Sequence, residues 1–297
     1  MKTKFILGLA ASLLVITGFK ERPKNLFKLK KGFTENFAYI PNGDVTLEEQ
    51  KIKTGAFYIF KTEVSNLQYR EFLNSLNDNG SNKNYAVKSK KWTESEIYLE
   101  PYQEHYSSHP AYENYPVVNV TKEGAEAFCK WLTEVYADKE IGLPEGYKLV
   151  FRLPTRAEWT HAANGELAGP YAWGGPFLRN AKGQQLANFS SLGAENIHMN
   201  PETGEFEVVS TIASVGVAGA LNDRADILAP INSYAPNRYG LVNMNGNAAE
   251  LLADTDQAAG GSWRCPGYDI RNESLMNFEE ASPEVGFRPI GVISKVN

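Results

Sequence analysis

The sequence has little of what disulfide-rich, metal-rich and nucleic-acid-binding proteins need. Its 297 residues include only two cysteines, which excludes a disulfide scaffold, and only four histidines. A basic excess is also missing. The 30 lysines and arginines stand against 35 acidic residues, and with the resulting net charge of -5 nucleic acid is not expected as a partner. No zinc-ligand spacing, phosphate-binding glycine loop or Ser-His-Asp arrangement is present.

What the chain does contain is the composition of an ordinary globular protein. Hydrophobic residues make up 42% and charged residues 22%, which excludes a disordered, collagen-like or coiled-coil chain. Glycine occurs 25 times and proline 15 times, and this abundance indicates a fold with many turns. The pattern shows no internal repeat and no second hydrophobic core, so a single domain is expected.

The first residues have the layout of a secretory signal peptide. Two lysines precede an apolar run over residues 5–16, and small residues follow. We therefore predict a signal peptide over residues 1–18, and the alternative is an uncleaved membrane anchor. No cysteine lies near Gly18, which argues against a lipoprotein.

The next stretch, residues 19–35, carries six basic side chains. We predict a solvated basic linker here, and the alternative is an arm that touches an acidic surface or lipid head groups. Without its leader the protein is expected to be acidic and extracytoplasmic, so its expected place is the exterior, the periplasm or the cell envelope.

The hydrophobic pattern predicts one α+β domain over residues 36–291, followed by a tail over residues 292–297. Helices are expected at 67–76, at 121–137 and after Thr155, with N-caps at Ser65, Thr121 and Thr155 and a capping box completed by Glu158. Strands are expected at 37–40, 57–60, 116–120 and 149–153, and a hairpin within 208–220. Residues 77–115 are polar without a clear period and are expected to form a long loop.

Several short motifs occur in order along this domain. The most specific is Arg-Leu-Pro-Thr-Arg-Ala-Glu-Trp at residues 152–159. The others are Ile-Pro-Asn-Gly at 40–43, Lys-Thr-Glu-Val-Ser-Asn at 61–66, Tyr-Pro-Val-Val-Asn-Val at 115–120, Asn-Met-Asn-Gly-Asn at 243–247, Gly-Gly-Ser-Trp at 260–263 and Gly-Phe-Arg at 286–288. This set resembles the formylglycine-generating enzyme family, also called the sulfatase-modifying factor domain family, over residues 36–291. The resemblance implies a variant of the C-type-lectin-like fold, a single loop-rich α+β domain with little regular secondary structure.

One loop is a candidate calcium site. Asn243, Gly246, Ala248 and Glu250 alternate over eight residues, and side-chain and backbone oxygens of this kind suit Ca2+. The resemblance implies a structural calcium ion at these four positions. The alternative is an asparagine- and glycine-rich turn with Glu250 as a surface carboxylate. By the same resemblance, Asn188 and the carbonyl of Phe189 match the start of a second calcium site.

A catalytic copper centre is not expected. The resemblance implies oxidases that use O2 and hold Cu(I) on two cysteines five residues apart, and soft thiolates suit that ion. The first cysteine corresponds to Cys265, but the second position is Ile270. Ser262 is retained, and Ser262 and Cys265 are the candidate catalytic residues if any chemistry survives. Copper-dependent formylglycine formation is therefore not predicted.

We expect an extracytoplasmic, non-catalytic binding or structural module. The motif style resembles gliding-motility and type IX secretion proteins of Bacteroidetes, which implies a protein partner in the cell envelope. A position beside a membrane and the oligomeric state stay open. One alternative is a metal-dependent oxidoreductase that oxidises cysteine with O2 through Cys265. A third idea is carbohydrate binding around Tyr171, Trp173 and Trp263.

Overall fold

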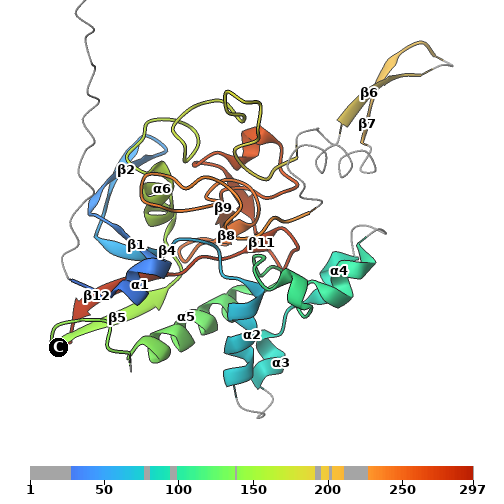
Figure 1. Cartoon of the computed structure of the whole chain (residues 1–297). Coiled ribbons are helices and arrows are strands. Elements are labelled where there is room, and N and C mark those ends of the chain that lie inside the picture. Colours follow the sequence, from blue (N-terminus) through green and yellow to red (C-terminus); the bar gives the residue numbers. More distant parts are fainter. Residues whose placement is uncertain are drawn as a thin grey trace, which may run out of the picture.

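The computed structural model describes residues 28–76, 81–93, 99–137, 139–190, 195–200, 203–210 and 227–296. Over these ranges the chain forms short helices and strands joined by long loops (Figure 1). The expected α+β architecture with little regular secondary structure is confirmed. The predicted signal peptide over residues 1–18 lies outside the described residues.

The central sheet joins segments from distant parts of the sequence. It contains β1 (Phe37–Ile40), β4 (Phe57–Phe60), β12 (Ile290–Lys295) and β5 (Tyr147–Arg152), in the order β1-β4-β12-β5. All three pairings are antiparallel, and Ile290 pairs with Ile59 on one side and with Arg152 on the other. Residues 292–295 continue this pairing with β5, so the predicted tail over 292–297 is wrong: its apolar residues complete the sheet.

Three helices have the starts that the sequence predicts. In α2 (Asn66–Ser75), Ser65 and Gln68 form a capping box, and in α6 (Arg156–Asn164), Thr155 and Glu158 form another. The longest helix, α5 (Lys122–Ala137), lies along β5 (Figure 1). Its buried face includes Phe128 and Leu132, which belong to the main hydrophobic core.

A second sheet carries the loops of the candidate site. It contains β10 (Leu275–Asn277), β9 (Gln257–Ala259), β8 (Ala249–Leu251) and β11 (Val285–Gly286), in the order β10-β9-β8-β11. The β8–β11 pairing is parallel and the others are antiparallel. Two separate hairpins are formed by β2 (Gly43–Leu47) with β3 (Gln50–Thr54), and by β6 (Glu195–Met199) with β7 (Phe206–Ser210). The rest of the predicted 208–220 hairpin, residues 211–220, lies outside the described residues.

Two expectations about the middle of the chain are wrong. The expected loop over 77–115 instead contains α3 (Ser81–Tyr85), η1 (Ser89–Trp92), α4 (Glu100–His105) and η2 (Pro110–Tyr112). These elements pack around an aromatic cluster in which Trp92 and Tyr106 are buried. No regular spacing of hydrophobic residues in the sequence indicates this packing. The expected strand over 116–120 is instead a buried segment with one bridge, between Ser65 and Pro116, and it contains Asn119 with a left-handed φ of 60°.

The packed body also starts before the predicted boundary at residue 36. Helix α1 (Lys31–Asn36) places Phe33 in the core, where it is 2% exposed and its ring stacks on Phe37 at 4.4 Å. The backbone N–H of Lys30 donates to the carbonyl of Ile141. The predicted basic linker is therefore folded from residue 28 onward. Its Phe33 side chain packs in the core and holds this segment against the domain.

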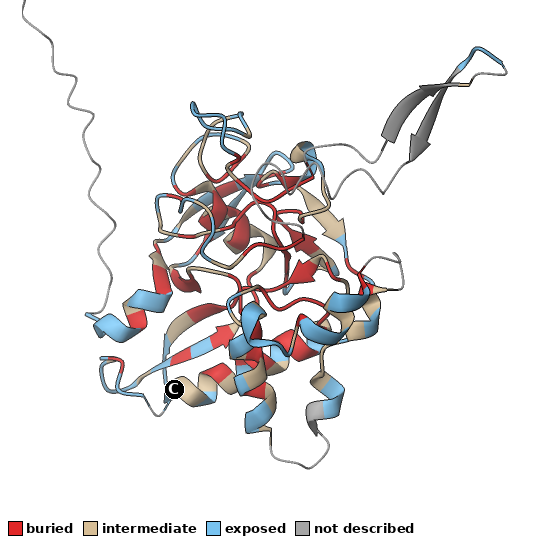
Figure 2. Ribbon diagram, turned by 45° about the vertical axis from the view of Figure 1, so that its right-hand side comes forward, coloured by how far each residue is buried: buried red, intermediate tan, exposed pale blue. Residues whose placement is uncertain are grey.

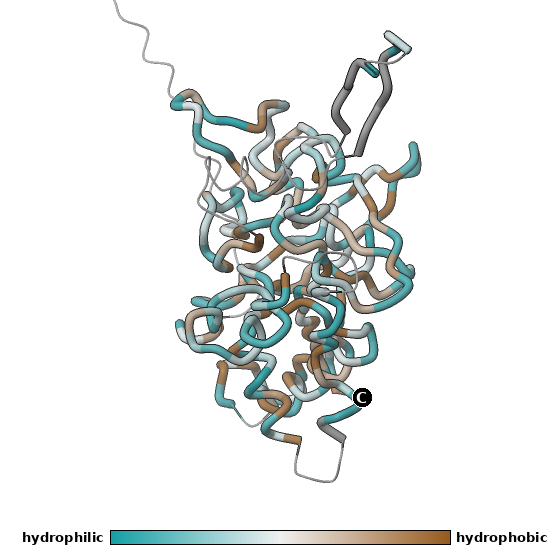
Figure 3. Tube along the Cα trace, turned by 90° about the vertical axis from the view of Figure 1, so that its right-hand side faces the viewer, coloured by the Kyte–Doolittle hydropathy of each residue, from teal (hydrophilic) through white to brown (hydrophobic). Residues whose placement is uncertain are grey.

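Buried residues lie toward the middle of the packed body and exposed residues lie around its outside (Figure 2). Hydrophobic and hydrophilic residues alternate in short stretches along the described chain (Figure 3). None of the helices within the described ranges has both the length and the apolar character that crossing a membrane requires.

Candidate functional site

The loop after β9 brings the predicted catalytic residues together. Gly261 has a φ of 66°, and a Cβ atom there would lie 2.4 Å from the carbonyl oxygen of Asp269, so this close turn requires glycine. The Ser262 side chain is fully buried and its hydroxyl donates to Glu284 Oε2 at 2.5 Å. The same hydroxyl oxygen lies 3.4 Å from Cys265 Sγ. Ser262 and Cys265 are therefore neighbours in space.

The Cys265 thiol is partly exposed and borders an apolar cluster. Its neighbours there include Phe189 and Ile270. Burial raises the pKa of the Cys265 thiol, and the hydrogen bond with Ser262 offsets only part of that effect. A protonated thiol is a poor nucleophile, so the site does not resemble one that activates a thiolate.

The position of the second copper cysteine is filled by a core side chain. Ile270, in η4 (Gly267–Ile270), is 0% exposed and packs in the same cluster as Cys265. The other cysteine of the chain, Cys129, lies on the buried face of α5 in the main core and belongs to a different cluster. Both cysteines are free thiols. A pair of thiolates on one ion therefore cannot form in this loop.

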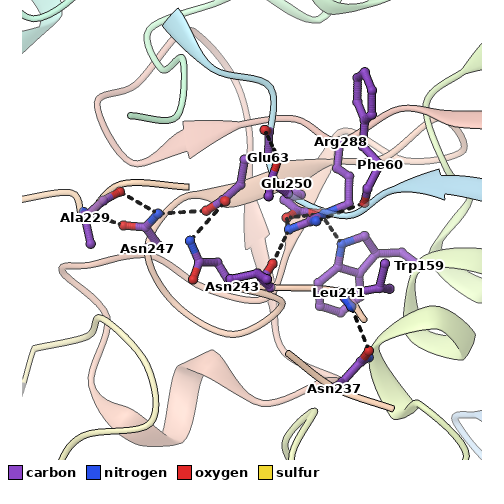
Figure 4. A network of polar contacts seen from close by, with 12 residues as sticks. Phe60, Glu63, Trp159, Ala229, Asn237, Leu241, Asn243, Asn247, Glu250 and Arg288 are labelled. Atoms are coloured by element: carbon purple, nitrogen blue, oxygen red, sulfur yellow. Dashed lines mark hydrogen bonds and ion pairs between the residues drawn. The ribbon is translucent and has the colours of Figure 1, made fainter. Parts of the chain in front are cut away.

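The predicted calcium loop is held by a buried polar network (Figure 4). Asn243 and Asn247 have left-handed φ angles of 57° and 63°. Their side-chain amides donate to the two carboxylate oxygens of Glu63, at 3.1 Å and 2.7 Å. Gly246 packs so tightly that a Cβ atom would lie 2.1 Å from the carbonyl oxygen of Asn188. The loop is thus a rigid turn inside the protein.

Glu250 is a buried residue, whereas the alternative to the calcium site had it as a surface carboxylate. It is 1% exposed, and both of its oxygens accept hydrogen bonds from the guanidinium of Arg288, which is 0% exposed. Oε2 also accepts from Trp159 Nε1 at 2.7 Å. The alternative of an exposed Glu250 is therefore wrong, because this carboxylate neutralises a buried arginine.

The four residues fit a calcium ion only in part. Asn243 Oδ1 is buried without a hydrogen-bond partner, which is what an oxygen ligand to a cation needs. The Glu250 oxygens, in contrast, face Arg288 and Trp159. The described residues contain no group of three or more His, Cys, Asp or Glu side chains placed to hold a metal. Calcium at Asn243, Gly246, Ala248 and Glu250 stays a prediction.

The second calcium site predicted at Asn188 and Phe189 stays a prediction. The Asn188 amide donates to the Ile227 carbonyl at 2.8 Å and to Asn247 Oδ1 at 3.1 Å. Phe189 is buried in the cluster with Cys265. Most residues between them and Ile227, where further ligands were expected, lie outside the described ranges.

Three residues of this region were missed from the sequence. Glu63 is fully buried, and burial raises its pKa to about 8 although the nearby Arg288 lowers it. Glu63 and Arg288 stand inside two of the quoted motifs, so their presence was a signal, but nothing in the sequence paired them. Met276 places its Sδ 3.6 Å from Cys265 Sγ, and no motif pointed to it.

A small mixed sheet, three well-formed helices and a buried asparagine-rich turn define a loop-rich α+β domain of one recognisable class. The model of the sulfatase-modifying factor enzyme 1-like domain matches residues 23–291, so the chain belongs to that family. It is 26% identical over 235 residues to the formylglycine-generating enzyme of Bos taurus, covering 69% of this chain and 50% of that protein. It is 32% identical over 174 residues to the enzyme of the same name from Thermomonospora curvata, covering 58% and 42%.

A relative whose name describes it as inactive also matches. The chain is 30% identical over 151 residues to the inactive C-alpha-formylglycine-generating enzyme 2 of Mus musculus, covering 50% of this chain and 35% of that one. The chain thus spans half or less of the length of these curated relatives. Among solved structures, PvdO from Pseudomonas aeruginosa superposes with a TM-score of 0.55 at 15% identity, covering 86% of this chain and 93% of that one. Treponema denticola variable protein 1 gives 0.51 at 17%, with coverage of 86% and 94%. These likenesses show the fold.

Proposed function

We propose that this chain is an extracytoplasmic, non-catalytic binding or structural module of the family. We further propose that it works in a cell-envelope assembly, such as a secretion or gliding machinery. The observation that carries the proposal is the burial of Ile270 beside Cys265, since it leaves a single thiol in the loop. The match to an inactive relative is consistent with it.

The argument about chemistry rests on the ligands that a copper oxidase needs. Cu(I) is held by soft sulfur ligands, and a two-thiolate site needs two cysteines within reach of one ion. The chain has two cysteines in total, and they lie in separate hydrophobic clusters. The raised pKa of Cys265 keeps its thiol protonated at neutral pH, which further weakens it as a reactant.

The catalytic half of the proposal is tested with a cysteine-containing substrate peptide, Cu(I) and O2. We expect no conversion of cysteine to formylglycine by mass spectrometry and no O2 uptake above the protein-free rate. The Thermomonospora curvata enzyme under the same conditions is the positive control. Conversion that disappears in Cys265→Ser would overturn the proposal and establish the alternative oxidoreductase.

The partner surface that we propose comprises two adjacent loops near Cys265. Phe177 is 75% exposed and Tyr268 is 67% exposed, more than any other large hydrophobic residue among the described ones. The loops touch, because Leu178 lies against Gly267. The guanidinium of Arg271 lies over the Tyr268 ring at 3.6 Å. Aromatic and arginine side chains dominate the energetics of protein interfaces, so we assign partner binding to this pair of loops.

The binding half is tested by co-purification from a cell-envelope extract. The double variant Phe177→Ser with Tyr268→Ser is expected to lose a specific partner while keeping its melting temperature. The matched control is Leu67→Ser, which changes a surface residue on α2 that is 37% exposed. If the double variant retains every partner of the unchanged protein, this surface is not the binding site. Export is checked separately by sequencing the amino terminus of protein recovered from outside the cytoplasm.

A further inference from the structure

We propose that the groove between the β2–β3 hairpin and the start of α6 binds a small zwitterion, an α-amino acid with an aliphatic side chain. The groove has a volume of about 480 Å³, which is within the range of ligand pockets. Strand β2 and helix α6 lie side by side at its edges (Figure 1). The site goes beyond the proposed module function, since none of the described residues that line the groove belongs to the loops of Cys265, Phe177 or Tyr268.

Arg156 is the group that holds the carboxylate of the ligand. Its side chain is 20% exposed, and its Nη1 donates to Glu48 Oε1 at 2.6 Å. Its Nε is buried and has no hydrogen-bond partner among the described residues. A buried N–H without an acceptor costs free energy, and the arginine fork is shaped to donate two parallel bonds to a carboxylate. Glu48 thus occupies one nitrogen of Arg156, and a ligand carboxylate satisfies the donor that is left.

Asp254 is the group that holds the ammonium of the ligand. Its Oδ1 accepts from the backbone N–H of Arg156 at 2.9 Å, so this carboxylate is fixed at the first residue of α6. Asp254 is exposed and lines the same groove. Beside it Thr255 Oγ1 is buried without a partner among the described residues. A hydroxyl both donates and accepts, so Thr255 suits a ligand that carries a carboxylate and an ammonium.

The charges that line the groove favour a zwitterion over a simple anion or cation. They belong to Glu48, Lys53, Arg156, Glu158 and Asp254. Glu158 is already neutralised, because both of its oxygens accept hydrogen bonds from Arg152. Two cations and two carboxylates remain, so a ligand with a net charge of either sign meets a like charge there. A ligand with one group of each sign has a partner for both.

The side chain of the ligand is selected by an apolar wall. Leu47 and Ile52 of the β2–β3 hairpin line the groove, with exposed fractions of 7% and 37%. An aliphatic side chain placed against them removes apolar surface from water on both partners. L-leucine carries both charges and an aliphatic side chain, and it is therefore the probe.

The test is calorimetric titration of the purified full chain with L-leucine and with two analogues that each lack one charge. These are 4-methylpentanoate, which has no ammonium, and 3-methylbutylamine, which has no carboxylate. We expect one equivalent of leucine per chain and binding of each analogue about tenfold weaker or more, because each loses a charge-assisted hydrogen bond. Arg156→Gln is expected to weaken leucine binding by the same factor. Asp254→Asn, which keeps an acceptor for the Arg156 N–H, is expected to do so too.

One variant is expected to gain affinity, which a loss of folding cannot imitate. Glu48→Gln removes a like charge beside the ligand carboxylate and is expected to bind leucine severalfold more tightly. The matched controls are Arg271→Gln and Glu273→Gln, at a surface ion pair of 2.9 Å whose side chains are 23% and 65% exposed. Both controls are expected to bind leucine like the unchanged protein. Melting temperatures of all variants show whether a loss reflects unfolding.

Three outcomes overturn the site. Leucine may give no saturable heat, Arg156→Gln may bind leucine with unchanged affinity, or 4-methylpentanoate may bind as tightly as leucine, which would describe a plain anion site without a role for Asp254. Any of these results leaves the non-catalytic proposal intact, because that proposal rests on Ile270 and Cys265. Conversion of a cysteine peptide overturns that proposal and leaves the amino-acid site standing.

Discussion

Arg288 and Glu250 form an ion pair inside the protein, with Nη2 of the arginine 2.7 Å from Oε1 of the glutamate. The guanidinium also donates to the backbone carbonyls of Phe60 and Val242. One arginine therefore joins the central sheet, the asparagine-rich turn and strand β8 (Figure 4). A second acid, Glu63, lies in the same network and has its pKa raised to about 8, mainly by burial, so it is mostly neutral at pH 7.

Replacing Arg288 is predicted to destabilise the protein strongly. Arg288→Met keeps much of the side-chain volume but leaves the Glu250 carboxylate buried without its cation. Breaking one partner of a buried ion pair costs about 3–5 kcal/mol, so we expect a loss of that order in the free energy of unfolding. Urea unfolding at pH 7 measures it. A loss below about 1 kcal/mol would show that the pair is dispensable.

Replacing Glu250 by glutamine is predicted to destabilise the protein less than replacing Arg288. In Glu250→Gln the arginine keeps a neighbour that can take over the negative charge, because Glu63 interacts electrostatically with Arg288 and ionises when an unpaired cation is near. We expect a smaller loss of unfolding free energy than for Arg288→Met, measured in the same urea series. The order of the two losses is the discriminating result, and the reverse order would refute a compensating role for Glu63.

Calcium binding at the asparagine-rich turn is predicted to be stoichiometric if the orphaned Asn243 Oδ1 is a ligand. Elemental mass spectrometry of the purified chain is then expected to give about one Ca2+, and EDTA is expected to lower the melting temperature because the ion binds only the folded state. Asn243→Ala is expected to lose the EDTA effect, while the surface variant Leu67→Ser retains it. If the protein contains no calcium and EDTA leaves its melting temperature unchanged, the positive charge at this turn comes from Arg288 and not from a calcium ion.

The capping box of α6 is predicted to give an acid-sensitive contribution to stability. Burial raises the pKa of Glu158, but hydrogen bonds from Arg152 and from the Thr155 backbone outweigh it, so the folded-state pKa lies below 4.5. A lowered folded-state pKa stabilises the protein above the unfolded-state value and loses that effect as the pH falls. Glu158→Gln is expected to cost about 1 kcal/mol at pH 7. The gap is expected to close as the pH drops below 4.5, which thermal melts across pH will show.

The two cysteines are predicted to differ sharply toward thiol reagents. Cys129 lies on the buried face of α5 and burial raises its pKa strongly, whereas Cys265 is partly exposed. We expect one slowly reacting thiol in the native protein and two in denaturant, counted with a chromogenic disulfide reagent. In Cys265→Ser the native count is expected to fall to zero. Two reactive thiols in the native state would mean that the α5 core opens readily.

Sequence patterns predicted local structure where local rules decide it. The capping boxes at Ser65 and Thr155 follow from residues three positions apart, and the structure has both. The 116–120 segment looked like a strand because valines favour extended backbone, but the left-handed Asn119 interrupts it. The aromatic packing around Trp92 depends on rings from separate turns, and no period along the chain marks it.

The candidate site divides in the same way. Ser262 and Cys265 are three residues apart on one turn, so the sequence placed them together. Glu63 and Glu250 come from distant segments, and nothing local predicts that Asn247 donates to Glu63 while Arg288 pairs with Glu250. Met276 reaches Cys265 only because β10 pairs with β9, a register that sequence alone does not determine.

The position of β12 between β4 and β5 has a consequence for how the chain is made. Strands β1, β4 and β5 are synthesised by residue 152, yet the strand that joins β4 to β5 begins at residue 290. A ribosome adding about 5–20 residues per second leaves that gap open for roughly seven to thirty seconds. During this interval the nascent sheet has an unfilled slot and is open to chaperones, proteases and export factors. The nascent chain thus cannot complete its central sheet until β12 has been synthesised.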